Sequence, residues 1–135
     1  MNGTRTSQRP ARVLAIDDNE DFCGMLGEML SPLGVEVEAI PCPATALQTF
    51  IQKRKYFDLV LLDYYMPDMN GEQMLDWLRQ LDPQIRIILC SVADEDRLQQ
   101  IVAAKRANAY IHKPFHCEDL VRIVANTLAC ASPEA

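Results

Sequence analysis

The chain has 135 residues, which is the length of one ordinary domain. Hydrophobic residues make up 49% and charged residues 24% of it, a balance that excludes disordered, fibrous and collagenous proteins. Thirteen Lys and Arg against nineteen Asp and Glu give a net charge of −6, so the basic surface that nucleic-acid binding requires is not expected.

No apolar run approaches the roughly 20 residues that cross a bilayer, and the first ten residues lack the apolar stretch of a secretory signal. We therefore expect a cytoplasmic protein with no membrane partner.

The cysteines are odd in number and form no C-x-x-C pair, which argues against a disulfide framework and a zinc site. We expect these residues to be reduced and mostly buried: Cys23, Cys42, Cys90, Cys117 and Cys130.

Taken in chain order, residues 1–10 carry almost no apolar side chains and are expected to form a disordered head. A folded domain is expected over residues 11–130, followed by a flexible tail at 131–135. The runs predicted to be strands are 13–16, 35–40, 59–62, 85–89 and 109–112. Helices are predicted where apolar residues recur at helical spacing: Phe22, Leu26, Met29 and Leu30; Ala46, Leu47, Phe50 and Ile51; Met74, Leu75 and Leu78; Leu98, Ile101 and Val102; Leu120, Val121, Val124 and Leu128.

Five strands that alternate with five helices predict an α/β fold with a parallel sheet. Strands in the middle of such a sheet are buried on both faces and are continuously apolar, whereas edge strands alternate. The runs at 13–16, 59–62 and 85–89 are continuous, and those at 35–40 and 109–112 alternate. This pattern favours the order 2-1-3-4-5, the doubly wound, flavodoxin-like arrangement with helices on both faces.

Polar residues follow the predicted strands at the edge where ligands bind in open α/β sheets. Asp17 and Asp18 follow the first strand, Asp63 the third, Ser91 the fourth and Lys113 the fifth. Each has a structural explanation when taken singly, such as a helix cap or a turn. Together, however, unpaired carboxylates repel one another and need a cation to remain ionised. Mg²⁺ fits best, because it is held by one or two carboxylates with water and phosphate completing its shell.

A site of this kind indicates phosphate chemistry. A carboxylate can act as the nucleophile that forms an aspartyl-phosphate, while a metal, a lysine and a hydroxyl neutralise the phosphoryl oxygens. Asp63 is best placed as the nucleophile, because it follows the middle strand.

These residues resemble the receiver domain of response regulators in two-component signal transduction. The resemblance covers roughly residues 11–130, and it implies that Asp63 accepts a phosphoryl group from a histidine kinase or a histidine phosphotransfer protein. It also implies that the domain is no enzyme beyond its own phosphorylation and dephosphorylation. The segments that carry the resemblance are Asp17-Asp18, the run LVLLDYYMPDMNG at 59–71, Ser91, and Lys113-Pro114-Phe115.

The resemblance also assigns roles to individual residues. Asp18 and Asp63 would ligate Mg²⁺ directly, Asp17 directly or through water, and the backbone carbonyl of Tyr65 would complete the protein's share. In the family, the lysine-proline peptide bond that corresponds to residues 113–114 is cis.

Ser91 would bind one phosphoryl oxygen and Lys113 another. Tyr110 matches the aromatic switch position and would turn inward when Ser91 moves, changing the face made by the fourth helix, fifth strand and fifth helix. Val92 departs from the small residue usual after Ser91, and its bulk could narrow access to the nucleophile. Ala93 can position no attacking water, which favours slow dephosphorylation.

Several alternatives stay open at this stage. We expect a stand-alone receiver, monomeric or weakly dimeric, that acts on an unidentified protein target. The chain could instead be a fragment of a hybrid histidine kinase or multidomain regulator, or a binding module that works without phosphorylation. A phosphohydrolase would need a second Asp at the position of Tyr65 as general acid. A nucleotide-binding domain would need a phosphate-binding loop in place of the acidic segment 18–21.

Overall fold

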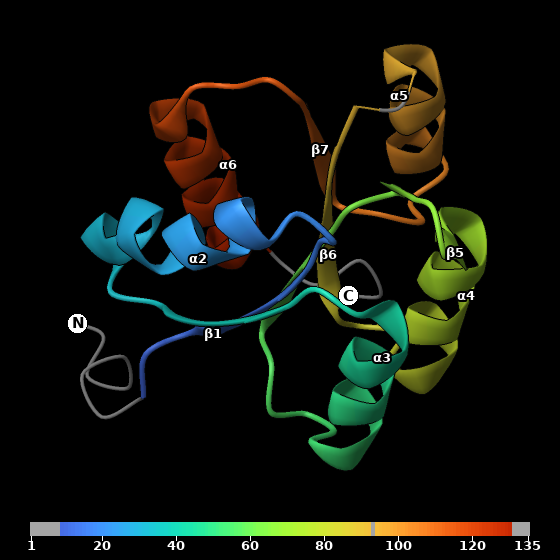
Figure 1. Cartoon of the computed structure of the whole chain (residues 1–135), viewed down its shortest axis with the longest axis horizontal. Coiled ribbons are helices and arrows are strands. Elements are labelled where there is room, and N and C mark those ends of the chain that lie inside the picture. Colours follow the sequence, from blue (N-terminus) through green and yellow to red (C-terminus); the bar gives the residue numbers. More distant parts are fainter. Residues whose placement is uncertain (1–8, 93, 131–135) are drawn as a thin grey trace.

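A single parallel sheet lies at the centre of the chain (Figure 1). The computed structural model describes residues 9–92 and 94–130, so the predictions for residues 1–8, Ala93 and 131–135 lie outside the described residues. The strands, in chain order, are β1 (Arg12–Ile16), β2 (Glu36–Ile40), β3 (Leu59–Leu62), β6 (Arg86–Ser91) and β7 (Ala109–His112). Their order in the sheet is β2-β1-β3-β6-β7, which confirms the predicted 2-1-3-4-5 arrangement.

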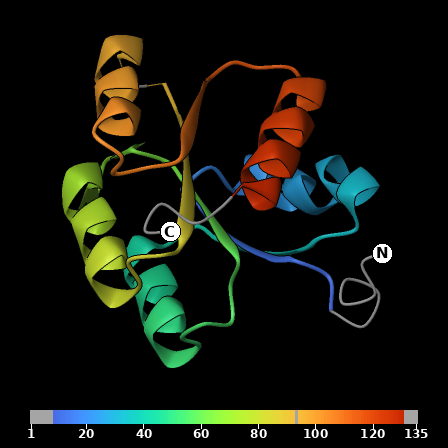
Figure 2. The ribbon, with the colours of Figure 1, turned by 180° about the vertical axis from the view of Figure 1, so that it is seen from behind.

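Helices cover both faces of this sheet (Figures 1 and 2). On one face lie α2 and α6, and on the other lie α3, α4 and α5. The predicted doubly wound arrangement is therefore confirmed. The bounds are α2 (Glu20–Met29), α3 (Pro43–Gln52), α4 (Gly71–Leu81), α5 (Glu95–Ala103) and α6 (Cys117–Ala129), with a short 3-10 turn η1 (Ser31–Leu33) after α2.

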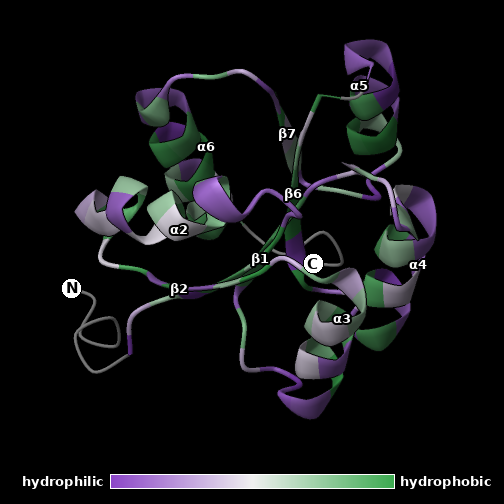
Figure 3. Ribbon diagram, viewed as in Figure 1, coloured by the Kyte–Doolittle hydropathy of each residue, from purple (hydrophilic) through white to green (hydrophobic). Residues whose placement is uncertain are grey.

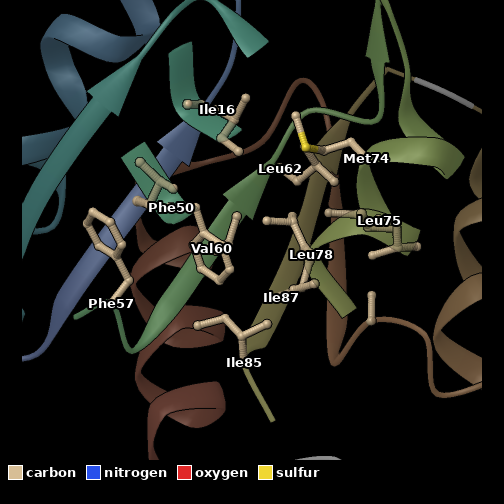
Figure 4. Packing of buried hydrophobic residues seen from close by; sticks show 14 of the residues in the cluster. Ile16, Phe50, Phe57, Val60, Leu62, Met74, Leu75, Leu78, Ile85 and Ile87 are labelled. Carbon is tan, nitrogen blue, oxygen red and sulfur yellow. The ribbon is translucent and has the colours of Figure 1, made fainter. Parts of the chain in front are cut away.

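The two faces hold two separate hydrophobic clusters, because side chains alternate along each strand. In β1, Leu14 and Ile16 pack toward α3, α4 and α5, whereas Val13 and Ala15 pack toward α2 and α6. Figure 4 shows the first cluster. Figure 3 shows the complementary pattern, with apolar strands inside and hydrophilic residues on the outer surfaces of the helices.

Local signals set the ends of the helices. Asn19 begins α2, because its side chain accepts a hydrogen bond from the backbone N–H of Phe22, and Asn70 begins α4 in the same way. Gly34 closes the turn after α2 with a left-handed φ of 67°, which glycine adopts without a steric penalty.

Some details differ from the sequence predictions. A small hairpin of β4 (Tyr65–Met66) and β5 (Met69–Asn70), which the sequence analysis did not predict, lies between β3 and α4. Ile51 is 46% exposed, because it lies on the outer side of α3 near the end of the helix.

The prediction of mostly buried cysteines is wrong, since only Cys90 is buried among the five. Burial raises the pKa of that thiol to about 12.

In the part of the chain that the structure describes, no helix has both the length and the apolar character needed to cross a bilayer.

Candidate functional site

The parallel register brings the ends of the central strands to one edge of the sheet. Ile16 of β1 pairs with Leu62 of β3, so the next residues, Asp17 and Asp63, emerge side by side. The backbone N–H of Asp63 donates to the carbonyl of Ile16 over 2.9 Å, which fixes the second strand end against the first. Strand β6 extends through Ser91, two residues beyond its predicted end, and so carries that hydroxyl to the same edge.

Three carboxylates meet at this edge. Asp17 and Asp63 are 3% and 5% exposed, whereas Asp18 is open to solvent. Each offers an oxygen, and these oxygens all lie within 4.8 Å of one another. Carboxylate oxygens are the ligands that Mg²⁺ prefers, and the exposed member leaves a path from solvent. The donor set therefore fits a hard divalent cation.

An ammonium group faces the two buried carboxylates. The Nζ of Lys113 lies 2.6 Å from Oδ2 of Asp17 and 3.7 Å from Oδ2 of Asp63. It also lies 4.6 Å from the ring centroid of Phe22, a cation–π geometry. Burial alone would lower the pKa of Lys113, but the hydrogen bond to Asp17 and the charges of Asp17 and Asp63 outweigh it and raise the pKa. Lys113 is therefore cationic at neutral pH.

The surroundings of Asp63 disfavour its negative charge. Burial raises the pKa of Asp63, and the neighbouring charge of Asp17 raises it further. The backbone N–H of Tyr65, the charge of Lys113 and a hydrogen bond with the Ser91 side chain oppose this shift without cancelling it. A buried carboxylate in this state gains from any nearby cation.

Backbone hydrogen bonds orient the two buried carboxylates. Asn19 donates its N–H to Oδ1 of Asp17 over 2.9 Å, and Tyr65 donates its N–H to Oδ1 of Asp63 over 3.0 Å. The other oxygen of each carboxylate consequently faces Lys113. The arrangement presents oxygen atoms, an ammonium and a hydroxyl to one point, which suits phosphoryl chemistry.

Comparison with known proteins agrees with this geometry. A family model described as the response regulator receiver domain matches residues 13–125. The chain belongs to the response regulator receiver family.

Relatives of this receiver differ widely in length. It is 31% identical over 118 residues to the chemotaxis protein CheY of Bacillus subtilis, an alignment that covers 87% of this chain and 97% of that protein. It is also 31% identical over 126 residues to the DNA-binding transcriptional regulator NtrC of Azospirillum brasilense, covering 93% of this chain but 26% of the relative. The receiver thus spans about a quarter of that longer regulator.

Among solved structures, the response regulator TrrA of Thermotoga maritima, in complex with Mg²⁺ and BeF, superposes with a TM-score of 0.74 at 26% identity. The superposition covers 87% of this chain and 98% of TrrA.

The other predicted residues of the receiver lie around the same edge. Ser91 is fully buried at the end of β6. Tyr110 lies on the neighbouring strand β7, and its hydroxyl donates to Oε2 of Glu95 over 2.9 Å and accepts from Nε2 of Gln99 over 3.0 Å. Its hydroxyl is therefore bound to α5 at the surface.

The two residues that follow the site segments at Tyr64 and Ser91 are exposed to solvent. Tyr65 is 68% exposed, and Val92 is 58% exposed. The Lys113–Pro114 peptide bond is cis, as the resemblance implied.

Two aromatic residues of the site were not predicted as functional. Phe22 was predicted on the apolar face of its helix and packs against the hydrophobic cluster there. Its ring also lies against Lys113 and meets the ring of Phe115 edge-on at 5.9 Å. No periodicity marks such a role, because it depends on how α2 and the segment after β7 meet. Tyr64 follows Asp63 directly and donates its hydroxyl to Glu72. Its position directly after Asp63 was the available signal.

Proposed function

We propose that this receiver takes a phosphoryl group on Asp63 from the phosphohistidine of a histidine kinase or a histidine phosphotransfer protein, in a reaction that requires Mg²⁺. The contacts of Asp63 carry the proposal. Its carboxylate lies within 4.8 Å of those of Asp17 and Asp18, 3.7 Å from Nζ of Lys113, and in a hydrogen bond with Ser91.

The covalent step is a displacement at phosphorus. A carboxylate oxygen of Asp63 attacks the phosphorus atom, the P–N bond to histidine breaks, and the imidazole leaves with the bonding pair and takes a proton from solvent. The raised pKa of Asp63 means that its negative charge is destabilised in the folded protein. Formation of a bond from this carboxylate to phosphorus removes that charge from the carboxylate. Lys113 would pair with one phosphoryl oxygen and the Ser91 hydroxyl would donate to another.

The residues present fit a magnesium ion. Asp17, Asp18 and Asp63 would hold it, together with the backbone carbonyl of Tyr65, and the ion would supply positive charge to the phosphoryl oxygens. The complex of the relative TrrA with Mg²⁺ and BeF supports this assignment.

The signal would leave through α5, β7 and α6. When the Ser91 hydroxyl turns from Asp63 to the phosphoryl group, Tyr110 would release Glu95 and Gln99 and turn inward. This change would alter the surface that a downstream protein reads. Action through contact with a downstream protein in the cytoplasm remains our prediction.

Phosphoryl uptake tests the proposal directly. The chain would be incubated with acetyl phosphate or with an autophosphorylated histidine kinase, in Mg²⁺ or in EDTA, and examined by intact mass. We expect one added phosphoryl group in Mg²⁺ and none in EDTA. Asp63→Asn should take up none, whereas the matched variant Asp58→Asn, altered at the opposite end of β3, should behave as the wild type. Uptake by Asp63→Asn, or no uptake by the wild type from either donor, would contradict the proposal.

A further inference from the structure

Tyr64, the residue after the proposed phosphoacceptor, forms a hydrogen bond with the first turn of α4. The hydroxyl of Tyr64 donates to Oε2 of Glu72 over 2.9 Å, in partly buried surroundings. A Cβ atom at Gly71 would overlap the carbonyl oxygen of Tyr64 and lie 2.8 Å from Cδ1 of its ring. The backbone beside Asp63 therefore packs directly against the first turn of α4, and glycine is needed for that approach.

The same carboxylate continues the contact to the next helix. Glu72 pairs with Arg97 of α5, and its other oxygen lies 3.5 Å from Nη1 of Arg106, in the turn after α5. Arg106 returns to α4 through a 2.8 Å contact with Asp76. A continuous series of polar contacts thus runs from the chain beside Asp63, through α4, to α5.

Helix α5 is well suited to respond to such contacts. It lies beside the edge strand β7, at the top right of Figure 1, and Figure 3 shows hydrophilic residues over much of its surface. Its fully buried hydrophobic side chains are Leu98 and Ile101. Polar contacts hold it from two sides: Glu72 reaches Arg97, and Tyr110 reaches Glu95 and Gln99.

We infer that Tyr64, Glu72 and Arg97 form a second connection between Asp63 and helix α5, separate from the one through Ser91 and Tyr110. The inference rests on the proposed phosphorylation of Asp63. Oδ1 of that residue accepts the N–H of Tyr65 over 3.0 Å. Formation of the acyl phosphate on this carboxylate redistributes its hydrogen bonds, so the backbone at 64–65 shifts. Tyr64 then changes its bond to Glu72, and Glu72 loosens its hold on Arg97.

Hydrogen exchange of the α5 amides tests the connection. The variant Tyr64→Phe removes one hydroxyl and leaves the ring in place. Without phosphoryl mimic, we expect exchange across residues 95–103 to be roughly two- to tenfold faster in this variant than in the wild type, the range for loss of one hydrogen bond. Beryllofluoride with Mg²⁺ should accelerate exchange there in the wild type and add less in the variant.

Matched variants separate this connection from a general loosening. Asp76→Asn breaks a neighbouring contact of Arg106 without touching Tyr64 or Glu72, and should leave the response of α5 to the mimic unchanged. Glu72→Gln should act like Tyr64→Phe. Adding Arg97→Gln to Tyr64→Phe should not reduce the response of α5 to the mimic any further, because both residues lie on one series of contacts.

The outcomes distinguish this inference from the proposed function. If Tyr64→Phe and Glu72→Gln take up a phosphoryl group normally but α5 responds to the mimic as in the wild type, the second connection is overturned and phosphorylation of Asp63 stands. If the wild type takes up no phosphoryl group, the proposed function fails and the inference fails with it.

Discussion

Two aspartates at opposite ends of the same strand have pKa values shifted in opposite directions. Asp58 precedes β3 and Asp63 follows it, and each accepts a backbone N–H, from Arg12 and Tyr65 respectively. Burial would raise the pKa of Asp58, but the hydrogen bonds from Arg9 and from the N–H of Arg12 lower it overall. At Asp63, burial and the charge of Asp17 prevail, and the pKa is raised.

The difference lies in how charges are shared at the two ends of the sheet. At the amino end, Asp58 pairs with Arg9, and along the edge strand β2 Glu38 pairs with Lys53. At the carboxyl end, Asp17 and Asp63 share the ammonium of Lys113, and Asp18 lies beside them. The first arrangement balances charge within the fold, whereas the second leaves negative charge that a bound cation would balance.

The largest effect is expected from loosening the chain at the carboxyl end of β3. Gly71→Ala should destabilise the fold by about 1–3 kcal/mol, because the new Cβ overlaps the Tyr64 carbonyl and forces the loop to move. Gly24→Ala is the matched control, since a Cβ there meets no atom within 4 Å and alanine favours the helix. Urea unfolding would compare the two. Equal stabilities would show that the loop accommodates a side chain without cost.

Magnesium should stabilise the fold through the carboxylates at the carboxyl end of β3 and not through Asp58 at its amino end. We expect the free energy of unfolding of the wild type to rise by about 1.4 kcal/mol at ten times Kd, because the ion binds the folded carboxylates. Asp63→Asn should lose most of this gain, and Asp58→Asn should keep it. Thermal unfolding with Mg²⁺ and with EDTA measures both. An equal response of all three proteins would place the cation elsewhere.

The same two variants should shift metal-free stability in opposite directions. A raised pKa in the folded state means that ionised Asp63 costs stability above its folded pKa and costs none below its ordinary value of about 3.9. Asp63→Asn should therefore stabilise the neutral-pH fold by about 1 kcal/mol, and the gain should vanish as the pH falls toward that value.

Asp58 should behave in the reverse sense. Its lowered pKa adds stability above the ordinary carboxyl pKa, which is lost as the pH falls through the folded pKa. Because the pair with Arg9 is partly exposed, Asp58→Asn should cost no more than about 1 kcal/mol at neutral pH. Unfolding measured in EDTA from pH 3 to pH 7 checks both variants. The same sign for both would remove the electrostatic contrast between the two ends.

The smallest effect belongs to a paired surface charge on the edge strand β2. Glu38→Gln breaks the 3.1 Å contact with Lys53, and both side chains are more than 40% exposed. We expect a loss below about 0.5 kcal/mol that disappears in high salt. Urea unfolding at two salt concentrations measures it, and a loss above 1 kcal/mol would mean that this exposed pair carries more stability than its exposure allows.

Much of the fold was predictable, because burial on both faces leaves a direct trace in the sequence. The continuous apolar runs gave the central strands and hence the sheet order. That order alone brings Asp17, Asp18 and Asp63 to one edge, so the acidic cluster was predictable from topology. The geometry agrees, with the three carboxylates within 4.8 Å of one another.

Contacts between helices left no such trace. Glu72 looks like any acidic residue in a first helical turn, and its links to Tyr64 and Arg97 depend on how α4 and α5 meet. The hairpin at 65–70 has strands of two residues, too short for an alternating pattern. The cysteines were predicted from their average burial, which says little about any one position.

The central claim is that the carboxylate after β3, rather than any of its neighbours, receives the phosphoryl group. The most direct test is to phosphorylate the wild type from a histidine kinase in Mg²⁺, reduce the acyl phosphate with borohydride, and locate the resulting homoserine by peptide mass spectrometry. The account predicts homoserine at position 63, with Asp17, Asp18 and Asp58 unchanged. Homoserine at any of those three positions, with Asp63 intact, would contradict it.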